Sequence, residues 1–209
     1  MGSKTPKQFL LVRGKPLLMW TFKRFYQFDP QIKIILALPQ DKIGYWETLC
    51  RKYSFDIPHS IAVGGKTRFE SVRNALEQIE ADDNALVAVH DGVRPLVSEE
   101  VIKNCFLTAS TKGAAIPVCP IVETIREVSK DLTSSRTVDR DEYRIVQTPQ
   151  TFQLGLLRKA YAQPYNDSFT DDASVVEALG VDVFLLEGNR ENIKVTTPVD
   201  LKIAKALLS

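Results

Sequence analysis

Short apolar runs alternate with segments of helical periodicity along this chain of 209 residues. The runs 34–38 and Leu86–Val89 are five and four residues long, which is typical of buried strands, and 183–186 is a further short strand late in the chain. Between them, segments 16–28 and 41–53 carry apolar residues at roughly helical spacing. Strands that alternate with helices predict an α/β fold with a mostly parallel sheet and helices on both of its faces.

Cap residues predict where two further helices begin. Ser98 is a favourable N-cap, and Thr197 is followed by proline at the first helical position. Pro117 lies in an apolar run, which indicates an edge strand or a bulge there. The remaining predicted elements are strands at 60–63 and 114–118 and a helix at 68–80.

The stretch 121–150 departs from this alternation, because its residues are polar and mixed with β-branched ones. A turn-like segment at 129–135 predicts a β-hairpin inserted after a core strand. A lone hairpin is marginally stable in water, so we expect it to pack as an arm against a second copy of the chain. The alternative is a hairpin folded back on its own domain.

Composition limits the class of protein but not its chemistry. The net charge is +1, so no overall basic field favours nucleic acid or a membrane surface as partner. No apolar run reaches the ~18 residues of a membrane span, and no signal peptide is evident. The length suits a single domain over 1–209. The cysteines Cys50, Cys105 and Cys119 lack metal-binding spacing and indicate reduced thiols of a cytoplasmic protein.

The segment after Leu86–Val89 carries the clearest chemistry, with the sequence His-Asp-Gly-Val-Arg-Pro at 90–95. Ligands of open α/β sheets bind beyond the carboxyl ends of the strands. Asp91 supplies a hard oxygen that suits Mg²⁺, and Arg94 offers a planar fork that suits phosphate. The segment therefore predicts a magnesium–nucleotide site, although a surface turn with solvated side chains is the alternative.

Other candidates for phosphate binding are weaker. Gly64 and Gly65 join a strand to a helix, and the donors of Arg68 and Ser71 follow, but neither a P-loop nor a G-x-G-x-x-G pattern is present. A Gly-Gly turn alone is more often only a turn. Lys194 precedes the last helix, where anions bind, and the acids after Thr170 could simply cap a helix.

In their order along the chain, these segments resemble the 2-C-methyl-D-erythritol 4-phosphate cytidylyltransferases of the non-mevalonate isoprenoid pathway. The resemblance implies a Rossmann-like nucleotidyltransferase fold, CTP as donor, Mg²⁺ as cofactor and a homodimer that swaps a β-arm. Each motif is weak, but the ordered set covers nearly the whole chain. The matching segments are 6–9, 64–71, 90–95, 137–140, 147–152, 170–174, 187–188 and 192–198.

The resemblance also implies roles for individual residues. A phosphate oxygen of methylerythritol phosphate would attack the α-phosphorus of CTP in line, and diphosphate would leave. Lys7 and Lys194 would stabilise the reacting phosphates, and Asp91 would hold Mg²⁺. The cytidine would be bordered by Gly64, Gly65 and Ser71 with Arg68 nearby, and the sugar phosphate would be bound by Arg94, Thr137, Asp139 and Thr170, partly across the dimer.

The sequence departs from the family at two places. Members carry a first strand and a glycine-rich loop with a catalytic arginine just before the Met-Gly that is residues 1 and 2 here. This indicates a truncated sequence or a misassigned start. Without that strand, two neighbouring strands should have unpaired edges, and CTP binding should be weak. Leu154 stands where some relatives have a basic residue for the substrate phosphate, so either Arg158 or Lys159 substitutes for it or the phosphate site is weaker.

Two alternative functions stay open at this point. One is a ribitol 5-phosphate cytidylyltransferase, which has the same chemistry; segments 137–140 and 170–174 favour methylerythritol phosphate instead. The other is an inactive, dimeric nucleotide-binding homologue, and the missing glycine-rich loop is its only support.

Overall fold

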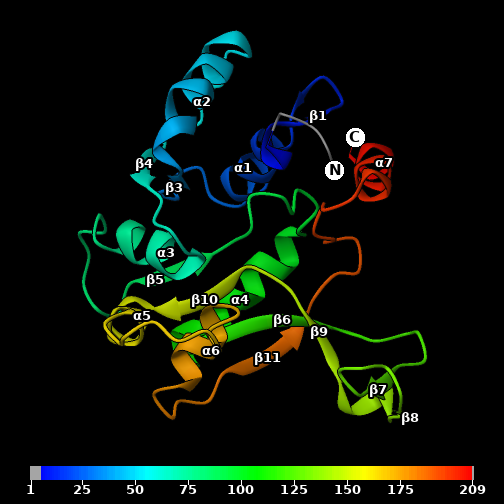
Figure 1. Cartoon of the computed structure of the whole chain (residues 1–209). Helices are drawn as coiled ribbons and strands as arrows, with labels where there is room; N and C mark the ends of the chain where they lie inside the picture. Colours follow the sequence, from blue (N-terminus) through cyan, green and yellow to red (C-terminus); the bar gives the residue numbers. More distant parts are fainter. Residues whose placement is uncertain (1–5, 209) are drawn as a thin grey trace.

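The largest sheet of the computed structural model, which describes residues 6–208, is mixed in direction (Figure 1). Strand β6 (Ala114–Pro120) runs parallel to β11 (Phe184–Glu187) and antiparallel to β9 (Arg144–Val146) and β10 (Gln150–Gln153). The α/β prediction is confirmed, but the sheet is not mostly parallel. The reason is that β10 returns directly from the inserted arm and so enters the sheet in the reverse direction.

Strand β5 (Leu86–Val89) also differs from its predicted environment. Its partner is β10, to which it runs antiparallel, and its residues are only partly buried. Strands β3 (Ile35–Leu38) and β4 (Ser60–Val63) form a separate parallel pair. Within residues 6–208, one edge of β3 and one edge of β5 have no strand partner. The outer edges of β4 and β11 are likewise unpaired within these residues.

Helices cover both faces of the larger sheet, as predicted. Alternate residues Ala114, Ile116 and Val118 of β6 face a core shared with α3 (Arg68–Leu76), α5 (Leu154–Tyr161) and α6 (Asp172–Glu177). Helix α4 (Glu99–Lys112) packs against the opposite face. The sheet is therefore enclosed between two layers of helices.

A second core packs against the pair β3–β4 and is built around aromatic side chains. Trp46 of α2 (Gln40–Lys52) is fully buried against Phe9, Phe22 and Phe55. Phe9 ends the short helix η1 (Lys7–Phe9), and Phe22 belongs to α1 (Leu17–Phe28). Val12 of β1 (Leu11–Val12) and Ala204 of the last helix, α7 (Pro198–Leu207), belong to a third core, and β2 (Lys15–Pro16) pairs with β1.

Several local predictions are confirmed at the level of single bonds. Ser98 caps α4 by accepting from the amide of Val101, and Thr197 forms a capping box with Asp200 at the start of α7. Helix α3 ends at Leu76, before the predicted residue 80. Beyond Glu77 the backbone hydrogen bonds, such as the one from the amide of Ile79 to the carbonyl of Leu76, span three residues instead of the four of an α-helix.

Pro117 lies in β6, which has strand neighbours on both sides, so of the two predicted positions, an edge strand or a bulge, the edge strand is wrong. Its carbonyl accepts from the amide of Gln147 at 2.9 Å, on the side where the antiparallel neighbours of β6 lie. On that side β10 pairs with β6 up to Ala115, and β9 pairs from Val118 onward. Pro117 therefore lies between the part of β6 that pairs with β10 and the part that pairs with β9. The N–H that proline lacks is not needed there for a hydrogen bond between strands.

The predicted hairpin is present as an arm that projects from the sheet, at the lower right of Figure 1. It contains β7 (Arg126–Val128) and β8 (Ser135–Thr137), which pair antiparallel, and the short helix η2 (Arg140–Glu142). Every residue of β7, β8 and β9 is exposed. In the described part of the chain, no helix has the length and apolar character that crossing a membrane requires.

Candidate active site

Three of the residues singled out from the sequence meet at the end of β5. Oδ2 of Asp91 lies 3.0 Å from Nε of Arg94 and 3.1 Å from Nζ of Lys194. Asp91 is mostly enclosed, with 16% of its side chain exposed, whereas 49% of the Lys194 side chain is exposed. The cluster therefore combines a fixed carboxylate with a lysine that can still reach a ligand.

Two further segments hold this cluster in place. The amide of Asp91 donates to Oγ1 of Thr148 at 3.1 Å, and Nη1 of Arg94 donates to the carbonyl of Asn192 at 2.8 Å. The buried Asn192 amide in turn donates to the carbonyl of Thr148 at 2.8 Å. Loops that are far apart in the sequence are thereby joined into one rigid base for the cluster.

His90 supports the same base as a neutral side chain. Burial is the main reason why its pKa falls to about 4. Nε2 lies 3.0 Å from the carbonyl of Arg94, which can only accept, so Nε2 carries the proton. Nδ1 then accepts from the hydroxyl of Thr148 at 3.0 Å, and that hydroxyl oxygen accepts from the amide of Asp91. His90 thus orients Thr148 and, through it, the Asp91 loop.

Asp91 remains ionised at neutral pH. Burial alone would raise its pKa, but the charges of Lys194 and Arg94 outweigh burial and lower it. Both ion pairs use Oδ2. No cluster of three or more His, Cys, Asp or Glu side chains exists among residues 6–208. One carboxylate suits Mg²⁺ that is held mainly by substrate phosphates, but not an ion caged by protein.

The Gly-Gly turn precedes α3, and its tight packing explains both glycines. A Cβ atom on Gly65 would overlap Cβ of Glu70, and one on Gly64 would lie 3.3 Å from the carbonyl carbon of Leu38. The amide of Gly65 donates to Oγ of Ser71 at 3.0 Å. The predicted residues Gly64, Gly65 and Ser71 therefore form one turn at a helix N-terminus, where anions bind favourably.

Arg68 is the first residue of α3 and makes a bidentate ion pair with Asp172 of α6. The two bonds measure 2.9 Å and 2.5 Å, and Asp172 is completely buried. Thr170, which the sequence also singled out, is exposed and lies two residues before Asp172. The ion pair therefore brings Thr170 into the same part of the molecule as the Gly-Gly turn.

Comparison with known proteins identifies the family. The family model for 2-C-methyl-D-erythritol 4-phosphate cytidylyltransferase matches residues 1–209. This chain belongs to that family. Enzymes of that name from Bacteroides fragilis and Phocaeicola vulgatus are 54% and 55% identical over 208 residues, covering 100% of this chain and 93% of each relative. Family membership confirms the predicted class, a cytidylyltransferase of isoprenoid biosynthesis.

Solved structures of the cytidylyltransferase family confirm the nucleotidyltransferase fold. The enzyme from Thermus thermophilus superposes with a TM-score of 0.81 at 35% identity, covering 97% of this chain and 93% of that chain. The enzyme from Francisella tularensis gives a TM-score of 0.83 at 33% identity, with coverages of 98% and 94%. The chain therefore shares the fold of these solved structures over nearly its whole length.

Three of the predicted cytidylyltransferase residues do not join the clusters within one chain. Lys7 is exposed in η1 and forms no side-chain hydrogen bond or ion pair with residues 6–208. Thr137 lies on the arm, where its hydroxyl accepts from Nη1 of Arg126 at 2.9 Å. Asp139 caps η2 by accepting from the amide of Asp141 at 2.9 Å. Their proposed roles need substrate or a second copy of the chain.

Leu154 and the two basic residues near it occupy a different environment from the one predicted. Leu154 is completely buried in the core. Arg158 donates to the carbonyl of Ile79 at 2.5 Å and lies 3.5 Å from Asp83, while Lys159 is exposed. Arg158 is therefore engaged in joining α5 to the end of α3.

Sequence reasoning missed Thr148, Asn192 and Asp172 as parts of the site. The first two lie in segments that match the family, yet a buried threonine or asparagine has no distinctive spacing in a single sequence. Asp172 was interpreted as a possible cap, and it is Asp171 that caps α6. Only burial distinguishes these neighbouring acids, and burial here depends on tertiary packing.

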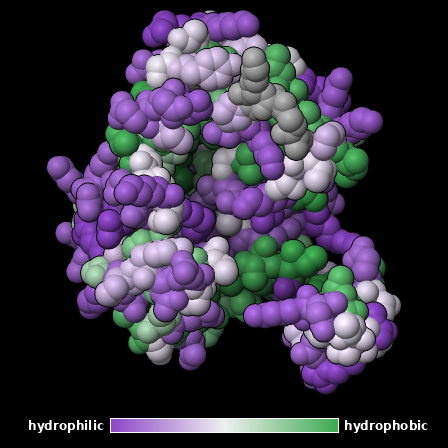
Figure 2. Space-filling model, viewed as in Figure 1, coloured by the Kyte–Doolittle hydropathy of each residue, from purple (hydrophilic) through white to green (hydrophobic). Residues whose placement is uncertain are grey.

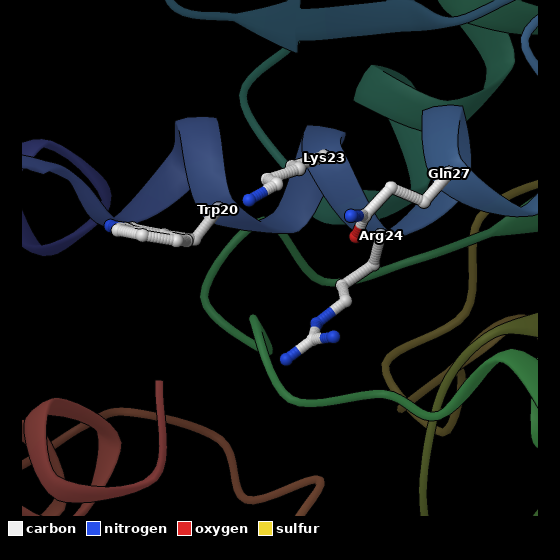
Figure 3. Close-up of a pocket in the computed structure, with 4 residues that line it drawn as sticks. All are labelled: Trp20, Lys23, Arg24 and Gln27. Atoms are coloured by element: carbon white, nitrogen blue, oxygen red, sulfur yellow. The ribbon is translucent and has the colours of Figure 1, made fainter. Parts of the chain in front are cut away.

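A small pocket is lined by residues of α1 (Figure 3). Trp20, Lys23, Arg24 and Gln27 line it, and its volume is about 80 Å³. Arg24 points toward the loop after β5 and donates to the carbonyl of Pro95 at 3.1 Å. Small-molecule sites usually measure about 300–1,000 Å³, so this pocket does not hold a nucleotide.

Proposed function

We propose that this protein transfers the cytidylyl group of CTP to 2-C-methyl-D-erythritol 4-phosphate and releases diphosphate. The observation that carries the proposal is the cluster of Asp91, Arg94 and Lys194 beyond the end of β5. This is the part of an α/β sheet where substrates bind. The family to which the chain belongs carries this activity in its name.

The proposed reaction brings two anions together, so its main requirement is neutralisation of charge. An oxygen of the acceptor phosphate bonds to the α-phosphorus of CTP. The bond from that phosphorus to the oxygen that bridges it to the β-phosphorus breaks, and diphosphate leaves with that oxygen. The acceptor phosphate is already ionised and needs no base to remove a proton. Catalysis of such a transfer rests on positioning and electrostatics. Lys194 and Lys7 are the proposed clamps on the reacting phosphates.

We assign Mg²⁺ to Asp91 as part of this proposal. Asp91 fits because it is ionised and because its partners occupy only Oδ2, which leaves Oδ1 for a metal. The ion would neutralise charge on the phosphate oxygens when bound. His90, through Thr148, would keep the carboxylate pointed toward it.

The nucleotide and the acceptor have separate proposed subsites. Gly64, Gly65, Ser71 and Arg68 would border the cytidine, because they lie together at the N-terminus of α3. Arg94 and Thr170 would bind the sugar phosphate from the same chain, and Thr137 and Asp139 would come from the arm of a partner. Figure 2 shows a recess with hydrophilic residues on its rim between the upper part of the molecule and the sheet.

A homodimer joined through the arm completes the proposal. The arm is exposed on all of its strands and carries large apolar side chains that a monomer leaves in water. Apolar surface of this kind marks an interaction site. The residues are Val122, Val128, Leu132, Tyr143, Ile145 and Val146.

We further propose the cytoplasm as the compartment in which the enzyme works. Cys50, Cys105 and Cys119 are all free thiols in the structure. Burial raises the pKa of Cys105 to about 12, so that thiol stays protonated and unreactive. Free thiols of this kind are typical of a reducing compartment.

The test is an assay of diphosphate release with CTP, Mg²⁺ and methylerythritol phosphate, with ribitol 5-phosphate in a parallel reaction. We expect release that requires all three components and that is faster with methylerythritol phosphate. Release with ribitol 5-phosphate alone would assign a different acceptor. Binding of CTP without release for either acceptor would identify an inactive nucleotide-binding homologue.

A further inference from the structure

Asp172 is the most completely enclosed charged side chain in the described chain, and it has three hydrogen-bond donors. Arg68 supplies two of them, and the hydroxyl of Tyr161 donates to Oδ1 at 2.6 Å. The three residues belong to three helices, α6, α3 and α5. A buried carboxylate requires such pairing, so each partner is held in one geometry.

Arg68 is not fully consumed by this contact. A guanidinium has five N–H groups, and only two of them reach Asp172, while 39% of the side chain is exposed. Burial alone would lower the pKa of Arg68, but Asp172 outweighs it and raises the pKa, and Asp91 contributes in the same direction. Arg68 therefore presents a fixed, permanent cation within the electrostatic reach of the Asp91 cluster.

We propose that Asp172 and Tyr161 are positioning residues that fix the guanidinium of Arg68 at the nucleotide end of the active site. The inference rests on the proposed function, in which Arg68 contacts CTP. Arginine has a long, flexible side chain, and a bidentate carboxylate removes that freedom before the nucleotide arrives. Asp172 would thereby increase the affinity for CTP without touching it.

The same contact joins the two substrate subsites. Arg68 follows the Gly-Gly turn on α3, and Asp172 follows Thr170 on α6. The ion pair thus sets the distance between the proposed nucleotide and acceptor subsites. Helix α6 has a second anchor, since Gln150 donates to Asp171 at 2.7 Å and accepts from the amide of Ala173 at 2.9 Å. Removal of the ion pair should therefore leave α6 attached.

The test measures CTP binding by calorimetry and the kinetics of the full chain for three variants. We expect Asp172→Asn to weaken CTP binding and raise the KM for CTP at least tenfold, with a smaller change in kcat. Tyr161→Phe keeps the ring stacked 4.7 Å from that of Phe69. It should raise the dissociation constant and the KM for CTP about threefold. Arg68→Lys keeps the charge but loses the fork, so it should resemble Asp172→Asn.

The matched control is Asp83→Asn, which alters an exposed Arg–Asp pair with a 3.5 Å separation. It should leave both the dissociation constant and the KM unchanged. The proposal is overturned when Asp172→Asn folds and binds CTP as the parent does, or when it loses only thermal stability. If Asp172→Asn does not fold, parental CTP affinity in Arg68→Lys and Tyr161→Phe overturns it instead. A parent chain that binds no CTP would refute the proposed function itself, which is a separate result.

Discussion

At the scale of single residues, Asp91 is the group whose charge the site depends on. Replacement by Asn keeps the shape but removes the negative charge that faces Arg94 and Lys194. We expect kcat/KM to fall by roughly a factor of 100 or more, the usual loss when one electrostatic group of an active site is removed. Steady-state assays over a range of Mg²⁺ concentrations measure this. Asp41→Asn, at an exposed pair with Lys42, is the control, and an active Asp91→Asn enzyme would exclude the assigned role.

His90 gives the protein a specific sensitivity to acid. Its pKa is about 4 in the folded protein and about 6.5 when unfolded, so the unfolded chain binds more protons between these values. The neutral His90 therefore contributes its full stabilisation at pH values above 6.5. As the pH falls, the free energy of unfolding decreases, by about 2 kcal/mol between pH 7 and pH 5. Urea unfolding at several pH values should show this slope. His90→Gln should flatten it, and an unchanged slope in that variant would assign the effect to other groups.

At the scale of elements, the turn after β11 depends on Gly188. A Cβ atom there would overlap Oε1 of the buried Gln147 and lie 3.3 Å from the carbonyl of Val118. Gln147 cannot move freely, since its amide donates to the carbonyl of Asn189 at 2.9 Å. We expect Gly188→Ala to lower the free energy of unfolding by about 1–3 kcal/mol, measured by urea denaturation.

Gly44 is the matched control for Gly188. It lies inside α2, and a Cβ atom there would meet no heavy atom within 4 Å. Gly44→Ala should therefore stabilise the protein by up to about 1 kcal/mol, because alanine has the higher helix propensity. If both substitutions changed the free energy of unfolding in the same direction, the predicted steric contact at Gly188 would not be the cause of the effect.

The sequence predicted elements better than it predicted their directions. The caps at Ser98 and Thr197 and the hairpin of the arm involve neighbouring residues, so local chemistry was sufficient to find them. The antiparallel strand β10 was not recognised, because Gln150 and Thr151 are polar although both are buried. Without β10, the sheet around β5 and β6 was predicted to be mostly parallel, whereas β10 pairs antiparallel with both strands. The same reasoning missed Asp172, whose role depends on Arg68, 104 positions away.

At the scale of the whole molecule, the arm predicts the oligomeric state. Val128 is exposed on β7, where a partner would cover it in the proposed dimer. We expect Val128→Asp to convert the dimer into monomers and to reduce the activity, because a buried unpaired charge opposes association. Light scattering after gel filtration measures the mass. Leu107→Asp, on the equally exposed surface of α4, is the control, and a dimeric Val128→Asp protein would place the interface elsewhere.

The division of the strands into two sheets has a consequence for cooperativity. The pair β3–β4, with the aromatic core around Trp46, shares no strand hydrogen bonds with the larger sheet in residues 6–208. Such a region can open locally at a lower free energy than global unfolding, so its amides should exchange with solvent first. A nucleotide that touches both the turn after β4 and the loop after β5 would span this division. Binding of CTP should then slow amide exchange in β3 and β4, because the bound nucleotide would hold this region against the larger sheet.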